Sequence, residues 1–314
     1  MGHSIIRVKP DPGTKSTGPG IFIFMKKIIL LIFFVCLFLN TAYAVEQYIS
    51  LAPSTTEILF SLGLDKKIVG VSAYCNYPEQ AKNKTKIGDF SSPNIEKIIS
   101  LKPDYIFCTG LEQVPVIARL RQLNLNVYVA DPVNIEGLFK TIREIGEITN
   151  KTREASLLIE KMQGEVQAVV SRVKLIPPEA RVKVFIEIWH EPLMTAAYGS
   201  FVDELITLAG GINIAHDLPR PYCNFSAEKV IRFNPQCIIM AYMDKESPLK
   251  LVKQRFGWDK IDAVKNQRVF NDINPDILLR PGPRITEGLA ELYKRLYPNG
   301  FGYRKPNHGL AAKG

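Results

Sequence analysis

The sequence lacks the short motifs that mark the common catalytic folds. It contains no Gly-x-Ser-x-Gly nucleophile turn, no phosphate-binding loop and no Gly-x-Gly-x-x-Gly dinucleotide turn. Glu187, His190 and Glu191 are acid–base groups close in sequence, but they follow a single expected strand and have no partner motif. These absences predict a protein that is not an enzyme and that needs no catalytic cofactor.

Histidine and dense basic runs are also scarce. Three histidines follow residue 44, namely His190, His216 and His308, which is too few for the His-rich site of a zinc or manganese carrier. The formal net charge is +9, yet no run of Lys and Arg with interleaved aromatic residues occurs. We therefore expect neither a bound metal nor nucleic-acid binding.

The five cysteines have spacings that match no metal-binding motif. Cys108 and Cys237 lie in apolar, strand-like runs and are expected to be small core residues. Cys75 and Cys223 lie instead in the similar loop sequences YCNY and YCNF. Three interpretations of this pair stay open: the thiols face one site, they face one another, or they are ordinary loop cysteines.

An export signal is predicted near the start of the chain. Lys26–Lys27 precede the apolar run Ile28–Leu39, and the small residues Ala42 and Ala44 follow it. This run is shorter than the roughly 20 apolar residues that span a bilayer as a helix. The pattern therefore predicts a cleaved signal peptide rather than a membrane anchor.

Three positions define this expected signal. Met25 is the expected start, and cleavage after Ala44 would release the mature chain into the periplasm. Cys36 lies inside the apolar run rather than at its end, where a lipoprotein signal carries its cysteine. We therefore expect no lipid anchor.

From Tyr48 onward, apolar runs typical of strands alternate with segments whose apolar residues recur at helical spacing. This order predicts an α/β fold with mostly parallel sheets covered by helices. The first helix is expected to be capped by Ser54 or Thr55. Residues 151–175 contain one Gly and no Pro, and predict a single helix roughly 35 Å long. The expected fold is two Rossmann-like lobes with this long connecting helix.

The expected domain boundaries follow these changes of pattern. They are an upstream extension and signal peptide (1–44), an N-terminal α/β lobe (45–148), a connecting helix (149–178), a C-terminal α/β lobe (179–297) and a loose tail (298–314). The tail has no apolar periodicity, so we expect it to pack little against the lobes.

One sequence unit of fourteen residues occurs twice, once in each half of the chain. The two copies are NIEKIISLKPDYIF (94–107) and SAEKVIRFNPQCII (226–239). Each reads as a short helix, a Pro and a strand, with Glu96 or Glu228 in the first helical turn and Phe90 or Tyr222 six residues earlier. A twofold arrangement would place one aromatic and one acid per lobe on a shared rim beside a cleft. The alternative is a common α/β unit that recurs by chance.

Six segments carry a likeness to a known family. They are ISLAPSTTEILFSLG, VGVSAYCNYP, NIEKIISLKPDYI, LAGGINI, SAEKVIRFNP and DILLRPGPRI. In this order, the region from Tyr48 to Tyr297 resembles the periplasmic substrate-binding proteins with a helical strut that serve ABC importers of vitamin B12, haem and iron–siderophores. Within that class the cobalamin-binding members are the most similar. The resemblance implies a monomeric carrier that holds a corrinoid as its transported ligand and delivers it to a membrane permease with its ATPase.

The resemblance implies a docking role for the two repeated glutamates. In the family, the acid in each such helix contacts arginines of the permease, which corresponds to Glu96 and Glu228 here. An anionic group on each lobe would orient and steer the encounter. The alternative is that both are surface residues that stabilise their helix N-termini.

The resemblance also implies where the ligand binds. Aromatic positions of the family's ligand cleft align with Tyr74, Phe90 and Tyr222, and a ligand-facing Asp and Arg align with Asp276 and Arg280. Aromatic faces can bury a broad, flat corrin while the polar pair bonds its side amides.

Some positions depart from the family pattern or extend it. Trp189 and Met194 are further candidates for the wall of the cleft, whereas Thr109 falls near a position where the family has a Trp. If Cys75 and Cys223 face the cleft, they could pair across it or contact cobalt as thiolates. We expect two separate thiols, because a bridge would obstruct the ligand.

Two alternative ligands of the same transporter class stay open. Haem would need an iron ligand, for which His190 and Tyr74 are the candidates. A ferric siderophore would need cationic groups, for which Arg280 and Arg220 are the candidates. For any of these ligands, the long helix predicts little closure of the lobes on binding.

Overall fold

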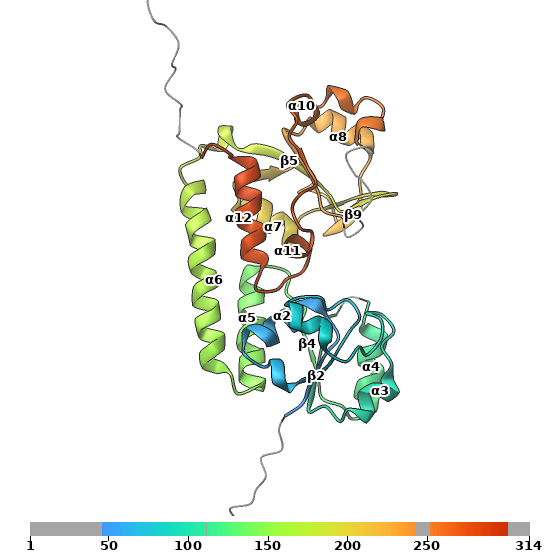
Figure 1. Cartoon of the computed structure of the whole chain (residues 1–314). Helices are drawn as coiled ribbons and strands as arrows, with labels where there is room; N and C mark the ends of the chain where they lie inside the picture. The colour runs from blue at the N-terminus through green and yellow to red at the C-terminus, as the bar shows by residue number, and fades with distance from the viewer. Residues whose placement is uncertain (1–45, 111, 243–251, 301–314) are drawn as a thin grey trace, which may run out of the picture. The chain divides into compact units, whose positions relative to one another are not determined.

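The structure is a computed structural model that describes residues 46–110, 112–242 and 252–300, with elements labelled in Figure 1. The predicted export signal, including Met25 and the cleavage position Ala44, lies outside the described residues, as does the part of the tail from residue 301. Within the described ranges, no helix combines the length and apolar character needed to cross a membrane.

The first lobe is built on a parallel sheet of four strands in the order β2-β1-β3-β4. Its strands are β1 (Tyr48–Ser50), β2 (Ile68–Val71), β3 (Tyr105–Cys108) and β4 (Val127–Val129). β1 is buried at every position, as expected for a parallel strand whose two faces are both covered. The other elements are α2 (Pro53–Ser61), η1 (Asp65–Lys67), η2 (Glu79–Asn83), α3 (Ile95–Ser100), α4 (Val114–Gln122) and α5 (Ile135–Ile148).

The second lobe repeats this plan with a parallel sheet in the order β11-β10-β5-β8. Its strands are β5 (Val182–Glu187), β8 (Gly211–Asn213), β10 (Cys237–Met240) and β11 (Val269–Phe270). β10 is buried at all its positions and lies at the centre of the sheet. The other elements are η3 (Pro178–Ala180), α7 (Phe201–Leu208), α8 (Ala227–Phe233), η4 (Trp258–Lys260), α10 (Asp262–Lys265), α11 (Asp276–Leu279) and α12 (Ile285–Leu296).

A third, antiparallel sheet was not predicted from the sequence. It is formed by β6 (Trp189–His190), β7 (Leu193–Ala196) and β9 (Tyr222–Asn224), in the order β6-β7-β9. β7 packs against β5 of the second parallel sheet. The strands have only two to four residues, too few to produce a periodic apolar run, so the sequence pattern does not reveal them.

A single long helix, α6 (Thr152–Val173), follows the first lobe in the chain. Its 22 residues span roughly 33 Å at about 1.5 Å per residue. It packs against α5, α7 and α12, and Figure 1 shows it running beside α5 and α12. Its buried side chains form one apolar stripe: Ala155, Ile159, Met162, Val169 and Val173. The predicted fold class, two α/β lobes with a long connecting helix, is confirmed.

The start of the first helix differs from the prediction. α2 begins at Pro53 and its N-cap is Ala52, so neither Ser54 nor Thr55 caps it. Proline is favoured at the first helical position because its missing N–H leaves no donor unsatisfied there. The two repeated helices do have side-chain caps, since Asn94 and Ser226 each accept a hydrogen bond from the backbone N–H three residues on.

Candidate ligand-binding site

The antiparallel sheet of the second lobe displays two of the predicted aromatic side chains. Trp189 pairs with Met194, which pairs with Asn224, while Tyr222 pairs with Ala196. Because side chains alternate between the faces of a strand, all five residues belong to one face. Trp189 is 38% exposed and Tyr222 is 42% exposed. This face therefore carries two partly exposed aromatic rings and a thioether.

His190 and Cys223 occupy the alternate register positions of the same sheet. Cys223 pairs with the buried Thr195, and His190 pairs with Leu193. The ring of His190 meets the ring of Tyr242 edge-on at a centroid distance of 5.7 Å. By strand alternation, Cys223 is not on the face that carries Tyr222, whereas the His190 ring also lies close to the Trp189 ring, at a centroid distance of 5.5 Å.

A buried ion pair lies at the end of β5, next to this sheet. The Glu187 side chain is fully buried, and its two oxygens accept hydrogen bonds from Nη1 and Nη2 of Arg255, both at 2.6 Å. The hydroxyl of Tyr242 also donates to Glu187. Burial and this carboxylate raise the pKa of Tyr242, so its hydroxyl stays protonated as a donor. Both oxygens of Glu187 are therefore satisfied within a packing network.

The loop that carries Tyr74 in the first lobe is held from inside by Cys75. Cys75 is 0% exposed, and its sulfur lies 3.0 Å from the hydroxyl of Thr56 and 3.2 Å from that of Ser72. Burial raises the pKa of the Cys75 thiol, which opposes a thiolate role. Tyr74 is 54% exposed. A fully buried Cys75 does not face a site on the surface, so it serves as an anchor of this loop rather than as a ligand contact.

The pairing of the cysteines follows from the same observations. Cys75, Cys108, Cys223 and Cys237 are all free thiols. Cys108 and Cys237 are fully buried in strands, which confirms their prediction as core residues. The separate placement of Cys75 and Cys223 agrees with two unpaired thiols.

A single buried amide holds the loop around Phe90. Gln113 is 0% exposed, and its Nε2 donates to the carbonyls of Leu51 and Phe90, both at 2.8 Å. Its Oε1 accepts from the N–H of Thr109 at 3.0 Å. Gln113 thus joins the segments that follow β1 and β3 to the loop before α3. The half-buried Phe90 owes its position to a residue that the sequence pattern did not single out.

Asp276 and Arg280 form an ion pair. Arg280 Nη1 lies 2.9 Å from Asp276 Oδ2, and the same Nη1 donates to Oδ1 of Asn76 at 2.7 Å. The Arg280 side chain is 14% exposed and the Asp276 side chain is 16% exposed. Asn76 follows β2 of the first lobe, so this contact joins the two lobes.

The two repeated glutamates are both exposed at the starts of their helices. Glu96 lies in the first turn of α3 and Glu228 in the first turn of α8. Hydrogen bonds from the backbone N–H of Glu228 and from the Ser226 side chain lower the pKa of the Glu228 carboxyl group, so this group stays ionised near neutral pH. Their docking role stays a prediction.

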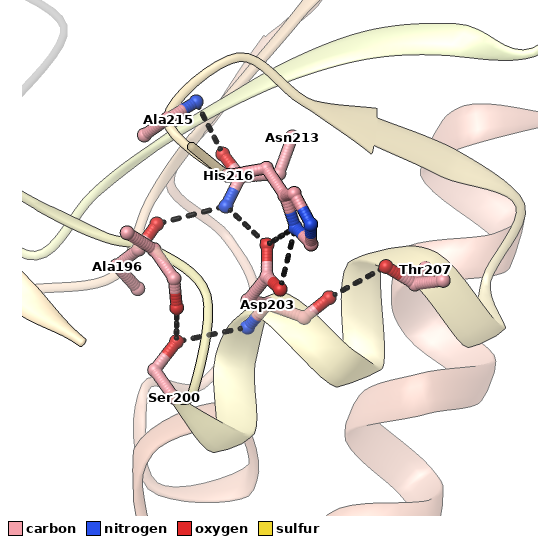
Figure 2. Close-up of polar contacts among 8 residues, drawn as sticks. Ala196, Ser200, Asp203, Thr207, Asn213, Ala215 and His216 are labelled. Carbon is pink, nitrogen blue, oxygen red and sulfur yellow. Dashed lines mark hydrogen bonds and ion pairs between the residues drawn. The ribbon is translucent and has the colours of Figure 1, made fainter. Parts of the chain in front are cut away.

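A buried polar network supports the edge of the second lobe (Figure 2). Asp203 of α7 is 4% exposed and accepts from Nδ2 of Asn213 at 2.7 Å, while Nδ1 of His216 lies 3.0 Å from its Oδ2. Asn213 also donates to the carbonyl of Ala196 at 2.8 Å. Because Ala196 pairs with Tyr222, the network fixes the strand on which Tyr222 is carried.

Two cavities of about 350 and 150 Å³ are lined by other residues. The larger is lined by Arg172 and Tyr293 among others, and the smaller by Tyr77 and Arg284 among others. None of the predicted ligand-binding residues lines either cavity. Within residues 46–110, 112–242 and 252–300, no group of three His, Cys, Asp or Glu side chains is arranged to hold a metal ion.

The family model described as periplasmic binding protein matches residues 49–274. The chain belongs to the periplasmic binding protein family. This result confirms the resemblance carried by the six segments, and places the chain among the substrate-binding proteins of ABC importers.

Individual relatives share most of their length with this periplasmic binding protein. An uncharacterized ABC transporter substrate-binding lipoprotein of Bacillus subtilis is 33% identical over 261 residues, which cover 82% of this chain and 81% of the relative. A vitamin B12-binding protein of Vibrio cholerae is 29% identical over 252 residues, covering 80% and 88%. The relatives are binding proteins, not enzymes.

A solved structure supports the same fold. A crystal structure of a periplasmic vitamin B12 binding protein of Vibrio cholerae matches with a TM-score of 0.70 and 28% identity, covering 80% of this chain and 96% of that one. The fold and family are therefore shown, while the positions that bind the ligand stay predictions.

Proposed function

We propose that this chain is the ligand-binding component of an ABC importer and that its ligand is a corrinoid. The relatives named for vitamin B12 binding, in sequence and in structure, support this choice. The mature protein would be exported to the periplasm, hold the ligand between the two lobes, and deliver it to a membrane permease with its ATPase. It would do so through Glu96 and Glu228.

The Asp276–Arg280 pair is the observation that most favours a corrinoid. The pair is neutral overall, and it offers a donor and an acceptor whose charged atoms are 2.9 Å apart. A primary amide has a carbonyl that accepts and an NH₂ that donates, so one such pair suits the side amides of a corrin. An anionic siderophore would instead favour unpaired cationic groups, and Arg280 is already paired.

Haem is the second candidate, and its iron would need a protein ligand. Tyr74 is exposed enough to approach such an iron. His190 is a further candidate, because its ring is close both to that of Trp189, at a centroid distance of 5.5 Å, and to that of Tyr242, at 5.7 Å. The neutral Asp276–Arg280 pair therefore favours the corrinoid over haem.

Calorimetry of the mature protein from Val45 tests the proposal. Cyanocobalamin and cobinamide should give binding heat, whereas haemin and a ferric siderophore should give little. Trp189→Ala should weaken corrinoid binding by roughly tenfold, because tryptophan is enriched among the minority of binding-surface residues whose truncation costs more than about 1 kcal/mol. Phe256→Ala is the matched control, since Phe256 is 99% exposed on the same lobe. Heat with haemin or the siderophore but with neither corrinoid would overturn the assignment.

A further inference from the structure

Asn76 and Arg280 come from different lobes and meet through one hydrogen bond. Nη1 of Arg280 donates to Oδ1 of Asn76 at 2.7 Å, although the residues are 204 positions apart. Asn76 lies between Cys75, which is buried, and Tyr77, which is 43% exposed. The buried Cys75 holds the loop, so the Asn76 amide reaches Arg280 from a fixed backbone.

The side chain of Asn76 ends in a primary amide, which is the functional group that rims a corrin. Its carbonyl oxygen takes from Arg280 the same kind of hydrogen bond that a corrin side amide would take. Arg280 Nη1 also faces Asp276 Oδ2 at 2.9 Å, so this nitrogen is fully engaged in the structure. A ligand amide can use it after Asn76 leaves.

We propose that Asn76 is a specificity-determining residue that occupies, in the ligand-free protein, the Arg280 donor that a ligand amide takes over. The inference rests on the proposed function, in which the Asp276–Arg280 pair binds a corrinoid side amide. Binding then exchanges one amide for another on Arg280, and the released Asn76, which is exposed, is hydrated by water. A ligand group that bonds Arg280 more weakly than an amide does is disfavoured by this exchange.

The exchange predicts whether each of two substitutions raises or lowers the affinity for the ligand. Asn76→Ala removes the internal competitor and leaves Nη1 free for the ligand, so binding should tighten. Asn76→Asp replaces the amide by a carboxylate, whose hydrogen bond to a guanidinium is stronger and harder to displace. That variant should bind the ligand more weakly, and the weakening should diminish as salt screens the new charge.

Isothermal titration of cyanocobalamin and cobinamide into the mature protein tests the inference. We expect Asn76→Ala to bind about three- to tenfold more tightly, and Asn76→Asp about tenfold more weakly, the range that a charge-assisted hydrogen bond near the surface supports. Asn83→Asp is the matched control, because Asn83 is exposed on the same lobe and the substitution adds the same charge. Its affinity should stay within about twofold of the unsubstituted protein, since isolated surface charges contribute little.

The outcomes separate this inference from the proposed function. If the unsubstituted protein binds a corrinoid and Asn76→Ala binds it equally or more weakly, Asn76 is a structural bridge and the inference is overturned alone. If the unsubstituted protein binds neither corrinoid, both fail together. Asn76→Ser, which also removes the amide, should reproduce the tightening and guards against an effect peculiar to alanine. Thermal unfolding followed by circular dichroism verifies that each variant is folded.

Discussion

Glu57 and Arg284 form a buried, two-pronged ion pair between the two lobes. Nε of Arg284 donates to Glu57 Oε2 at 2.9 Å, and Nη2 donates to Oε1 at 2.6 Å. The Glu57 side chain is 3% exposed and that of Arg284 is 12% exposed. The guanidinium also lies 3.7 Å from the centroid of the Tyr77 ring. This pair connects α2 of the first lobe to the residue that precedes α12 of the second.

Removing the cation of this pair should markedly lower the stability of the folded protein. Arg284→Met leaves the Glu57 carboxylate buried without its partner, which typically destabilises a protein by about 3–5 kcal/mol. The free energy of unfolding from urea titration measures the effect. Lys82→Met is the control, because the Lys82–Glu79 pair is 52% and 79% exposed and should matter by less than about 1 kcal/mol. Equal losses in the two variants would show that the buried pair has no special role.

The double variant Glu57→Leu with Arg284→Met separates the pair from its partners. Replacing both charges with apolar side chains of similar size avoids the unpaired carboxylate, so we expect it to be more stable than Arg284→Met alone. Urea titration of both variants in one series gives the comparison. A double variant less stable than Arg284→Met would contradict this account of the pair.

The pH dependence of stability should reveal the titration of the Glu57 carboxyl group. Burial raises the pKa of Glu57, and the guanidinium of Arg284 offsets only part of that shift. A carboxyl group whose pKa is higher in the folded state contributes stability at acidic pH, and this contribution is lost as the pH rises through the folded-state pKa. Glu57→Gln removes the titration, so its stability should decline less than that of the unsubstituted protein from about pH 4.5, near the ordinary glutamate pKa, to pH 7. Parallel stability profiles for the two proteins would show that Glu57 does not titrate in this way.

The buried amide of Gln113 offers a local test in the first lobe. Gln113→Leu leaves two carbonyls and one N–H without their partner, and each buried polar group left unsatisfied costs about 1–3 kcal/mol. We expect reduced stability together with faster hydrogen exchange in the loop around Phe90, which mass spectrometry can localise. Gln122→Leu, on an exposed position of α4, is the control and should change neither. Unchanged exchange near Phe90 in the first variant would show that Gln113 does not hold that loop.

Thiol reactivity should follow burial. Burial raises the pKa of both Cys108 and Cys237 to about 12, and Cys75 is also fully buried. Cys223 is partly exposed, so alkylation of the folded mature protein should modify Cys223 first. Peptide mass spectrometry after brief treatment with iodoacetamide measures the order. Early modification of Cys75 would show that its loop opens readily.

Much of the fold was predictable because the spacing of apolar residues in strongly periodic segments indicates whether they form helices or strands. The alternation of strands and helices, the long helix α6, and the caps at Asn94 and Ser226 all follow from local chemistry. The antiparallel sheet with Trp189 and Tyr222 was missed because its strands have only two to four residues and few buried positions. Short exposed strands leave no periodic signal.

The site was less predictable because the sequence around a polar side chain does not show which distant residue it will bond. The ion pair between Asp276 and Arg280 is local, four residues apart, and its helical spacing is visible in the sequence. The contact of Asn76 with Arg280 and the buried position of Gln113 depend on how distant segments pack. Cys75 illustrates the same limit, since one buried residue in a loop cannot be told from an exposed one by its neighbours in sequence.

The two repeated glutamates give the last prediction, on delivery to the transporter. Both are exposed in the first turn of a short helix, and ionised carboxylates at these positions can pair with cationic groups of a permease. Glu96→Ala with Glu228→Ala should leave corrinoid affinity within about twofold, because isolated surface charges contribute little to a distant site. It should sharply reduce stimulation of the ATPase when the protein is added to its transporter in liposomes. Glu136→Ala is the matched control, since Glu136 is an exposed acid in the first turn of α5 with an Asn cap. Full stimulation by the double variant would leave both glutamates with a helix-stabilising role alone.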